Sequence, residues 1–332
     1  MAQKEQVQSK EDMSSSSLFT PPIVRSGTNA INRALFSKKL DLAAAAVHDA
    51  RSISKWQKSL SRGRELLHVP RISSVVVHPN DGKKCLLLNS TVKAPAPETW
   101  GPVLKEAVQL NEVSVVPYQL QLDYDYWSYF DVMQSILPEE LHVEIPTGFN
   151  TAGHVGMQFT TSLLIAANLF CSNPHSVPAH LNLRDMYVPY KKVIAEVLLD
   201  KNPHIKTVIN KVDNVGEASE FRTFQYEVLA GEDNLQVQVA ENGCTFEFDY
   251  SKVYWNSKLE SEHTRLINMF KPGEVVCDVM AGIGPFAVPA GKRGVFVWAN
   301  DMNPESYKCL EDAIKKNKVS ESLTPQDALP TC

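Results

Sequence analysis

Two acidic residues and two glycines near the end of the chain have the spacing of a nucleotide-binding site. Asp278 closes an apolar segment, Gly282 and Gly284 follow in a tight turn, and Asp301 closes the next apolar segment. Glycine lets a backbone approach a ligand where a Cβ atom would clash. An acidic side chain after the second segment can accept hydrogen bonds from both hydroxyls of a ribose. The pattern therefore predicts a site for a cofactor that contains a nucleoside.

The same turn fits two classes of cofactor, dinucleotides and S-adenosylmethionine (AdoMet). Gly282, Gly284 and Ala287 satisfy the G-x-G-x-x-G/A spacing of dinucleotide-binding folds. However, the Asp278 carboxylate would repel a pyrophosphate, and Pro285 lacks the N–H group that a phosphate would bind. Both features favour AdoMet, which carries a positive charge and an amino-acid group.

The elements around this turn follow the order of a doubly wound α/β domain. Residues 274–279 and 294–299 are short, continuously apolar segments, which is typical of strands in a buried parallel sheet. Helical spacing of apolar residues runs over 259–270, 286–292 and 305–318. This alternation of strands and helices predicts a Rossmann-like α/β fold.

The preceding part of the chain predicts a mixture of helices and strands. Turn residues indicate hairpins over 72–88 and 224–239, and a further strand follows over 244–248. Helical patterns run over 43–67 and 188–199. We therefore expect α+β domains ahead of the Rossmann-like domain.

Four cations recur at helical spacing, at Arg51, Lys55, Lys58 and Arg62. Steps of three and four residues place them on one face of a helix, where they could bind the phosphates of an RNA backbone. A solvated helix face without a ligand has the same pattern, and these residues alone do not choose between the two interpretations.

Composition limits the class of protein. With 33 Lys and Arg against 38 Asp and Glu, the formal net charge is −5, which excludes a globally basic nucleic-acid binder. The six cysteines are scattered, which argues against a structural metal or a disulfide framework and suits a reducing compartment. No apolar run has the length of a membrane span. We expect a soluble, intracellular monomer without a metal or a membrane partner.

Several unrelated motifs occur in the order found in one enzyme family. They are Asn210–Val212, Phe221–Phe224, Glu227–Glu232, Phe248–Asn256, Leu259–Arg265 and Asp278–Phe286. With these motifs, residues 18–319 resemble the eukaryotic and archaeal tRNA (guanine-N1)-methyltransferase family. The resemblance implies AdoMet as the cofactor, tRNA as the partner, and methyl transfer to N1 of guanosine 37 beside the anticodon. It also implies a location in the cytoplasm and nucleus, or in the mitochondrial matrix.

The resemblance assigns roles to individual residues. Guanine N1 carries a proton at neutral pH, so its methylation needs a base and a cation that stabilises charge on O6. Glu262 matches the family's base, with a pKa expected to rise once the target base enters the pocket, and Arg222 matches the partner of O6. The matched cofactor residues are His263, Asp278, Gly282, Gly284, Asp301 and Met302.

Three departures from the family pattern lead us to expect a truncated, poorly active form. Residues 156–178 interrupt a segment that is continuous in the family, and the only Pro-Pro is Pro21-Pro22, whereas the family has an Asn-Pro-Pro motif near its target base. The family's Asp-Gly segment after the third strand is missing as well, so the last strand would expose an apolar edge. The alternatives are a tRNA-binding form without catalysis and the transfer of an aminocarboxypropyl group from the same cofactor.

These observations divide the chain into five segments. They are a disordered arm (1–20), an N-terminal tRNA-contacting domain (21–130), a middle α+β domain (131–255) with the insert 156–178, a partial Rossmann-like methyltransferase domain (256–319) and an atypical tail (320–332).

Overall fold

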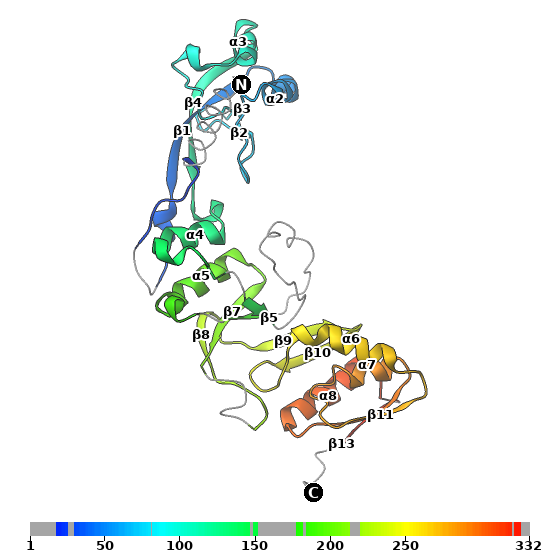
Figure 1. The fold of residues 1–332 in the computed structure, drawn as a ribbon. Coiled ribbons are helices and arrows are strands. Elements are labelled where there is room, and N and C mark those ends of the chain that lie inside the picture. Colours follow the sequence, from blue (N-terminus) through cyan, green and yellow to red (C-terminus); the bar gives the residue numbers. More distant parts are fainter. Residues whose placement is uncertain are drawn as a thin grey trace, which may run out of the picture. The chain divides into compact units, whose positions relative to one another are not determined.

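The computed structural model describes the chain as two compact units (Figure 1). The described residues are 18–25, 30–80, 82–146, 149–151, 177–181, 184–212, 220–320 and 322–326. The first unit takes in Asn32–His142 and residues up to Ser26, and the second takes in Val143–Cys332 and Gly27–Ile31. The division lies beyond the expected boundary at residue 130, because helix α4 (Tyr129–Ile136) belongs to the first unit. Most of the expected arm 1–20 lies outside the described residues.

A four-stranded antiparallel sheet forms the centre of the first unit, in the order β2-β3-β1-β4. Its strands are β1 (Lys38–Val47), β2 (Val75–Val77), β3 (Lys84–Leu87) and β4 (Val113–Leu122). Helices α2 (Ile53–Arg62) and α3 (Pro102–Gln109) bury apolar side chains in the same hydrophobic cluster as this sheet. The pairing of β2 with β3 confirms the predicted hairpin over 72–88.

The predicted helix over 43–67 is wrong at both ends. Residues 43–47 are the end of β1, between β3 and β4, and the helix is confined to α2. Alanine favours a helix by only a small free energy per residue. Ala43, Ala44 and Ala45 are fully buried between the neighbouring strands, so tertiary packing overrides their helix propensity.

The second unit begins with a four-stranded mixed sheet, in the order β5-β6-β7-β8. Its strands are β5 (Phe149–Thr151), β6 (Val177–Leu181), β7 (Ile205–Lys211) and β8 (Tyr226–Gly231). Helix α5 (Lys191–Lys201) connects the parallel strands β6 and β7, which confirms the helix predicted over 188–199. Of the insert 156–178, only the last two residues are described, at the start of β6; the others lie outside the described residues.

The predicted hairpin over 224–239 is wrong. Strand β8 pairs with β7, whereas β9 (Gln236–Glu241) pairs with β10 (Cys244–Asp249), which includes the strand expected over 244–248. The last residue of β8 lies very close to β7: a Cβ atom on Gly231, at φ +86°, would lie 2.0 Å from the Lys206 carbonyl oxygen. The turn residues after Gly231 therefore connect strands of two different sheets. Local sequence does not specify which strands pair.

The third part of this unit is a parallel sheet with α/β connections, as predicted. It contains α6 (Glu260–Met269), β11 (Val275–Asp278), α7 (Ala287–Lys292), β12 (Phe296–Asn300), α8 (Pro304–Asn317) and β13 (Leu323–Gln326). The strands run parallel in the order β11-β12-β13. The sequence predicts an atypical tail over 320–332, but residues 323–326 form the third strand of this sheet.

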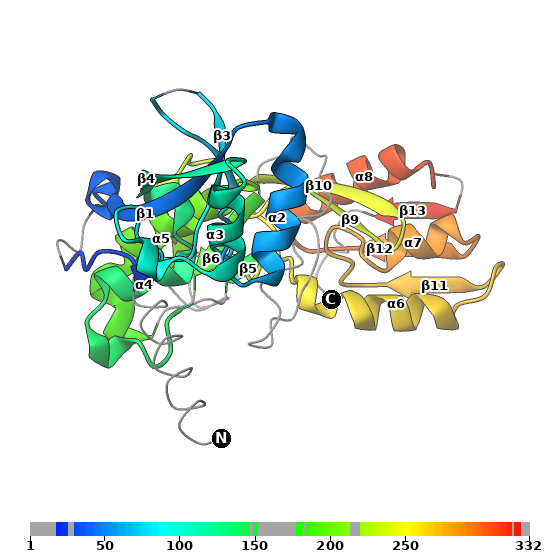
Figure 2. The ribbon, with the colours of Figure 1, turned by 90° about the horizontal axis from the view of Figure 1, so that it is seen from above.

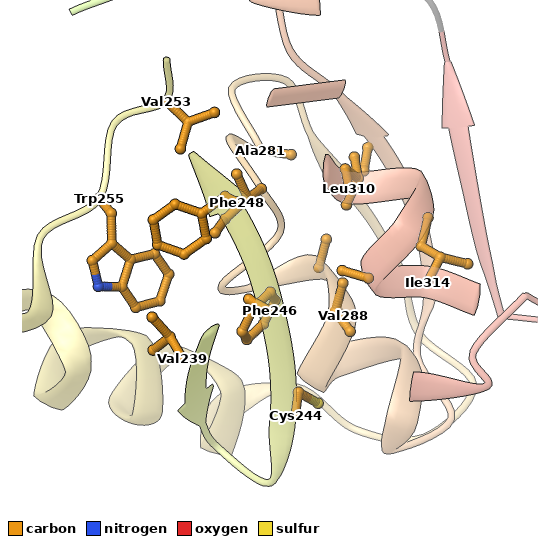
Figure 3. Close-up of a cluster of buried hydrophobic side chains, with 14 of the residues drawn as sticks. Val239, Cys244, Phe246, Phe248, Val253, Trp255, Ala281, Val288, Leu310 and Ile314 are labelled. Atoms are coloured by element: carbon orange, nitrogen blue, oxygen red, sulfur yellow. The ribbon is translucent and has the colours of Figure 1, made fainter. Parts of the chain in front are cut away.

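A shared hydrophobic core joins the β9-β10 hairpin to the parallel sheet. Helix α7 packs against β12, and α8 packs against β10 and β13 (Figure 2). Figure 3 shows Phe246 and Phe248 of β10 between Trp255 on one side and Val288 and Leu310 on the other. This core fixes the turn between β11 and α7 to the rest of the unit.

One face of the parallel sheet is apolar and open to solvent. Val275 of β11 lies opposite Phe296 of β12, and Cys277 lies opposite Trp298. Their exposure is 71% for Val275, 51% for Phe296 and 57% for Trp298. The intervening residues of β12, Val297 and Ala299, are buried on the other face. The exposed apolar surface is thus a face of β11 and β12, whereas the sequence predicted an exposed apolar edge on the last strand.

Candidate functional site

The turn after β11 is built from two glycines with different roles. Gly282 has φ +58°, and a Cβ atom on it would meet nothing within 4 Å. Gly284 has φ +92°, and a Cβ atom there would lie 2.6 Å from Leu310 Cδ1 and 2.8 Å from Val288 Cγ2. Gly282 therefore leaves open space beside the backbone, where a ligand can approach. For Gly284 the structure supplies a packing reason, because α7 and α8 approach closely here; its predicted contact with a ligand stays a prediction.

Asp278 is the last residue of β11, and its carboxylate is only partly hydrogen-bonded. Its Oδ2 atom is buried and has no hydrogen-bond partner among the described residues. Burial raises the pKa of this carboxyl group, and the charge of Asp301 raises it further, while a hydrogen bond from the Met280 N–H opposes the shift. A buried acceptor without a donor is costly, so Asp278 is a candidate ligand-binding group.

Asp301 holds the loops on both sides of the candidate site. Its Oδ2 accepts the Gly282 N–H at 2.7 Å, and its Oδ1 accepts the Asn303 N–H at 2.9 Å. The carboxylate thus ties the loop after β12 to the turn after β11, and each oxygen keeps a second lone pair for a ligand. Met302, the next residue, is half exposed.

His263 is a buried side chain of α6 held by an acid from a distant strand. Its Nδ1 lies 2.5 Å from Glu241 Oε1, and both side chains are almost fully buried. Its ring contacts Phe286 edge to face, with 4.6 Å between the ring centroids. Since Phe286 directly follows the turn at Gly282–Pro285, His263 lies at the border of the candidate site.

Glu262 and Arg222, the two predicted catalytic residues, lie at the surface. Arg265 donates to both oxygens of Glu262, at 2.7 Å from Nε and 2.6 Å from Nη2. These hydrogen bonds lower the pKa of Glu262, whereas we expected a raised pKa for the state with a bound guanine. The Arg222 guanidinium lies over the Tyr254 ring at 6.0 Å. No hydrogen bond or ion pair joins Arg222 to Glu262 in the part of the chain that the structure describes.

Two of the four cations of the predicted basic face form ion pairs with acidic residues of the protein. Trp56 and Leu60 bury the opposite face of α2, and the carboxylate of Glu65 turns inward to accept the N–H groups of Val103 and Leu104. Lys55 pairs with Glu112 at 2.9 Å, and Arg51, just before α2, pairs with Asp49 at 3.4 Å. Lys58 and Arg62 are exposed, and no ion pair involving either is present among the described residues.

The described residues show neither a membrane-spanning helix nor a metal-binding cluster. None of their helices is long and apolar enough to cross a bilayer. None of their His, Cys, Asp and Glu side chains form a group of three or more able to hold a metal ion.

Two known domain families match residues of the second unit. Residues 237–328 match the TRM5/TYW2 methyltransferase domain, and residues 178–234 match the TYW2 N-terminal domain. The tRNA (guanine(37)-N(1))-methyltransferase of Neurospora crassa is 65% identical over 93% of this chain. The enzyme of that name from Aspergillus fumigatus is 49% identical over 93% of the chain. Over most of its length the chain is thus similar to enzymes named tRNA (guanine(37)-N(1))-methyltransferase.

Two solved structures share the fold of this chain. Trm5b from Pyrococcus abyssi aligns with 86% of this chain and 71% of its own, at 23% identity and a TM-score of 0.53. An aTrm5 in complex with tRNALeu aligns with 87% of this chain and 74% of its own, at 20% identity and a TM-score of 0.59. The chain spans 61% of the length of the Neurospora family member and 60% of the Aspergillus one.

Three residues of the site were not predicted from the sequence. Arg265 lies in a family motif that gives it no role, Glu241 ends a strand distant in sequence from His263, and Asn300 precedes the predicted Asp301. The structure gives each a partner in the site: Glu262 for Arg265, His263 for Glu241, and the Val279 carbonyl for Asn300. A signal was present only for Arg265, which stands three residues after Glu262 on a predicted helix.

Replacing Asp278 with asparagine is expected to stabilise the ligand-free protein at neutral pH. The raised pKa means that folding disfavours the charged carboxylate, so its contribution to stability is lost as pH rises through that pKa. The gain in Tm of Asp278→Asn over wild type should therefore shrink as pH falls through the raised pKa, and it should be gone below about 3.9, the ordinary pKa of aspartic acid. Thermal unfolding at several pH values measures it, and a variant less stable than wild type at pH 7 would contradict this.

Proposed function

We propose that this protein transfers a methyl group from AdoMet to N1 of guanosine 37 in tRNA. The observation that carries the proposal is the buried Oδ2 of Asp278, which has no hydrogen-bond partner among the described residues and lies near the open turn at Gly282 in the chain. It occurs in a chain 65% identical to a protein named tRNA (guanine(37)-N(1))-methyltransferase. A buried anion needs a cation or a donor, and the amino-acid end of AdoMet supplies both.

The residues at the carboxyl ends of β11 and β12 fit AdoMet. Asp278 would take its amino-acid end, the open side of Gly282 would admit the ligand against the backbone, and Asp301 would accept the ribose hydroxyls. His263 and Met302 border this region and would contact the remainder of the cofactor. When bound, the sulfonium group of AdoMet supplies an electrophilic methyl group.

The protein's own task is to activate guanine N1. Glu262 would remove the N1 proton, and Arg222 would stabilise the negative charge that moves onto O6. In the free protein Arg265 occupies both oxygens of Glu262, so the base must exchange at least one of these bonds for the guanine N–H. Arg222 is bound only loosely over Tyr254, which leaves its guanidinium able to turn toward a nucleotide.

A methylation assay with two labels tests the proposed function. Unmodified tRNA with guanosine at position 37 should incorporate label from the methyl group of AdoMet, and the same tRNA with adenosine at this position should not. AdoMet labelled in its aminocarboxypropyl chain should transfer no label to either tRNA. Equal methylation of the two tRNAs, or transfer of the aminocarboxypropyl label, would refute the proposal.

We also propose that α2 contributes to tRNA binding through Lys58 and Arg62. The double variant Lys58→Ala/Arg62→Ala should bind tRNA more weakly, because each cation contacts a phosphate and releases counterions. The slope of log affinity against log salt concentration should become less steep by roughly 1 for each phosphate that is no longer bound. Filter binding over a salt series measures this, with Lys308→Ala on α8 as the control. An unchanged slope would show that the two cations bind no phosphate and belong to a solvated helix face.

A further inference from the structure

Glu241, the last residue of β9, is a buried acid that holds a histidine of another element. Its side chain is 4% exposed, and that of His263 on α6 is 6% exposed. The Nδ1 atom of His263 lies 2.5 Å from Glu241 Oε1. A carboxylate buried at this depth needs a donor or a cation, and His263 meets that need. Glu241 therefore holds the His263 ring by one of its two nitrogens.

This contact decides which nitrogen of His263 carries a proton and which is left for a ligand. An ionised carboxylate only accepts hydrogen bonds, so Nδ1 is the donor and, in the neutral ring, Nε2 is an acceptor. The two nitrogens lie on different sides of the ring, so Nε2 faces away from the Glu241 carboxylate. No hydrogen bond to Nε2 is present among the residues that the structure describes. Nε2 is thus the polar atom of His263 that a ligand can use.

An aromatic contact places the His263 ring at the border of the glycine turn. The Phe286 ring meets it edge to face, with 4.6 Å between the ring centroids. Phe286 directly follows the turn at Gly282–Pro285, and the turn has open space beside its first glycine. Glu241 thus determines which hydrogen-bonding group His263 offers next to the candidate cofactor site.

The neighbouring residues form a second contact between the same two elements. Asn242 follows Glu241, Thr264 follows His263, and the Thr264 hydroxyl lies 2.8 Å from Asn242 Oδ1. The β9-β10 hairpin therefore contacts α6 at two consecutive positions. The second contact holds the helix without touching the imidazole, so its loss separates an effect on the helix from an effect on the His263 ring.

We propose that Glu241 is a positioning residue for the cofactor site, which orients His263 so that its Nε2 accepts a hydrogen bond from AdoMet. The inference rests on the proposed function and deepens it, because it assigns a role in cofactor recognition to a strand outside the parallel sheet. A neutral ring with an acceptor suits a cofactor that carries a positive charge. Without Glu241 the ring is free to move its proton to Nε2, and it would then present an N–H group to the donors of the cofactor.

Calorimetry with S-adenosylhomocysteine tests this role through variants of Glu241. Glu241→Leu removes the acceptor and should raise the Kd by about 10-fold, the effect of one good hydrogen bond. Glu241→Gln keeps an acceptor for Nδ1 and should stay within about threefold of wild type. In a His263→Gln background, Glu241→Leu should change the Kd by less than about twofold, because the two residues act as one unit. Equal weakening in both backgrounds would show that Glu241 does not act through His263.

NMR of the wild-type protein with ¹⁵N-labelled histidine tests the proton position without any substitution. The chain has nine histidines, and His263→Gln identifies the signals of His263. The neutral ring should show a protonated Nδ1 and an unprotonated Nε2, and the Nε2 signal should move when S-adenosylhomocysteine is added. A proton on Nε2 of the neutral ring overturns the inference, and so does an Nε2 signal that the ligand leaves in place.

Thr264→Val is the matched control, because it breaks only the second contact between the hairpin and α6. It should leave the Kd within about twofold of wild type and the His263 signals unchanged, and thermal unfolding reports whether each variant is folded. Weakening equal to that of Glu241→Leu would assign the loss to a loosened helix and overturn the positioning role, while cofactor recognition stands. A wild-type protein that does not bind S-adenosylhomocysteine overturns the proposed function together with the inference.

Discussion

Glu262→Gln is expected to lower kcat for methylation of guanosine 37 by about 100- to 10,000-fold, the usual contribution of a general base. Glutamine keeps the size and the helix propensity of the side chain but cannot accept the N1 proton at neutral pH. AdoMet affinity should not change, since Glu262 is exposed and is not bound to the turn at Gly282. Single-turnover methylation together with calorimetry measures the two quantities separately.

Glu260→Gln is the matched control, because Glu260 is an exposed acid in the same first turn of α6. It should retain wild-type turnover. A Glu262→Gln variant within about threefold of wild type would remove Glu262 from the mechanism.

The pH profile gives a separate test of Glu262. Its hydrogen bonds to Arg265 lower its pKa, so the base stays ionised at lower pH than an ordinary glutamate, whose pKa is about 4.3. The acidic limb of kcat/KM reports groups of the free enzyme and should lie below that value. Arg265→Gln should move this limb to higher pH, and an unmoved limb would show that the Glu262–Arg265 pair does not set it.

Gly284→Ala is expected to destabilise the second unit strongly. The new Cβ atom would meet Leu310 and Val288 at 2.6 and 2.8 Å, and overpacking of this kind costs about 1–3 kcal/mol. The positive φ of +92° adds a further penalty of about 1–2 kcal/mol for a residue with a side chain. Chemical denaturation should show a lower free energy of unfolding for the unit that contains the parallel sheet.

Gly282→Ala is the informative comparison. Its Cβ atom would enter open space, so only the backbone penalty of about 1–2 kcal/mol applies. Its larger effect should be on AdoMet affinity, because the methyl group would occupy the side on which the ligand approaches. Equal stability of the two variants would contradict the packing role of Gly284.

The site near Asp278 could be predicted because its residues are close in sequence. Two short apolar segments, a glycine turn and Asp301 belong to one β-α-β unit, so spacing alone places them at one edge of a sheet. The family resemblance added Glu262 and Arg222, which spacing would not have found. Contacts between distant segments could not be predicted. Glu241 on β9 pairs with His263 on α6, and no local sequence pattern encodes this contact.

The errors in the fold have the same origin. The alanine-rich residues 43–46 form a strand because β3 and β4 flank them. The turn after Gly231 changes sheets instead of closing a hairpin. Strand β13 was missed because Thr324 and Pro325 interrupt any apolar pattern, and proline is tolerated in a strand at the edge of a sheet.

The open face of β11 and β12 gives the protein an intrinsic fluorescent reporter. Of the five tryptophans, Trp56, Trp127 and Trp255 are buried, Trp100 is partly buried, and Trp298 is 57% exposed. Trp298 shares this solvent-exposed face with Phe296 of its own strand and with Cys277, its partner on β11, so its emission should be red-shifted and readily quenched by acrylamide. Any polypeptide that settles on this face would shift the emission to shorter wavelength, and the spectrum would record that contact without an added label.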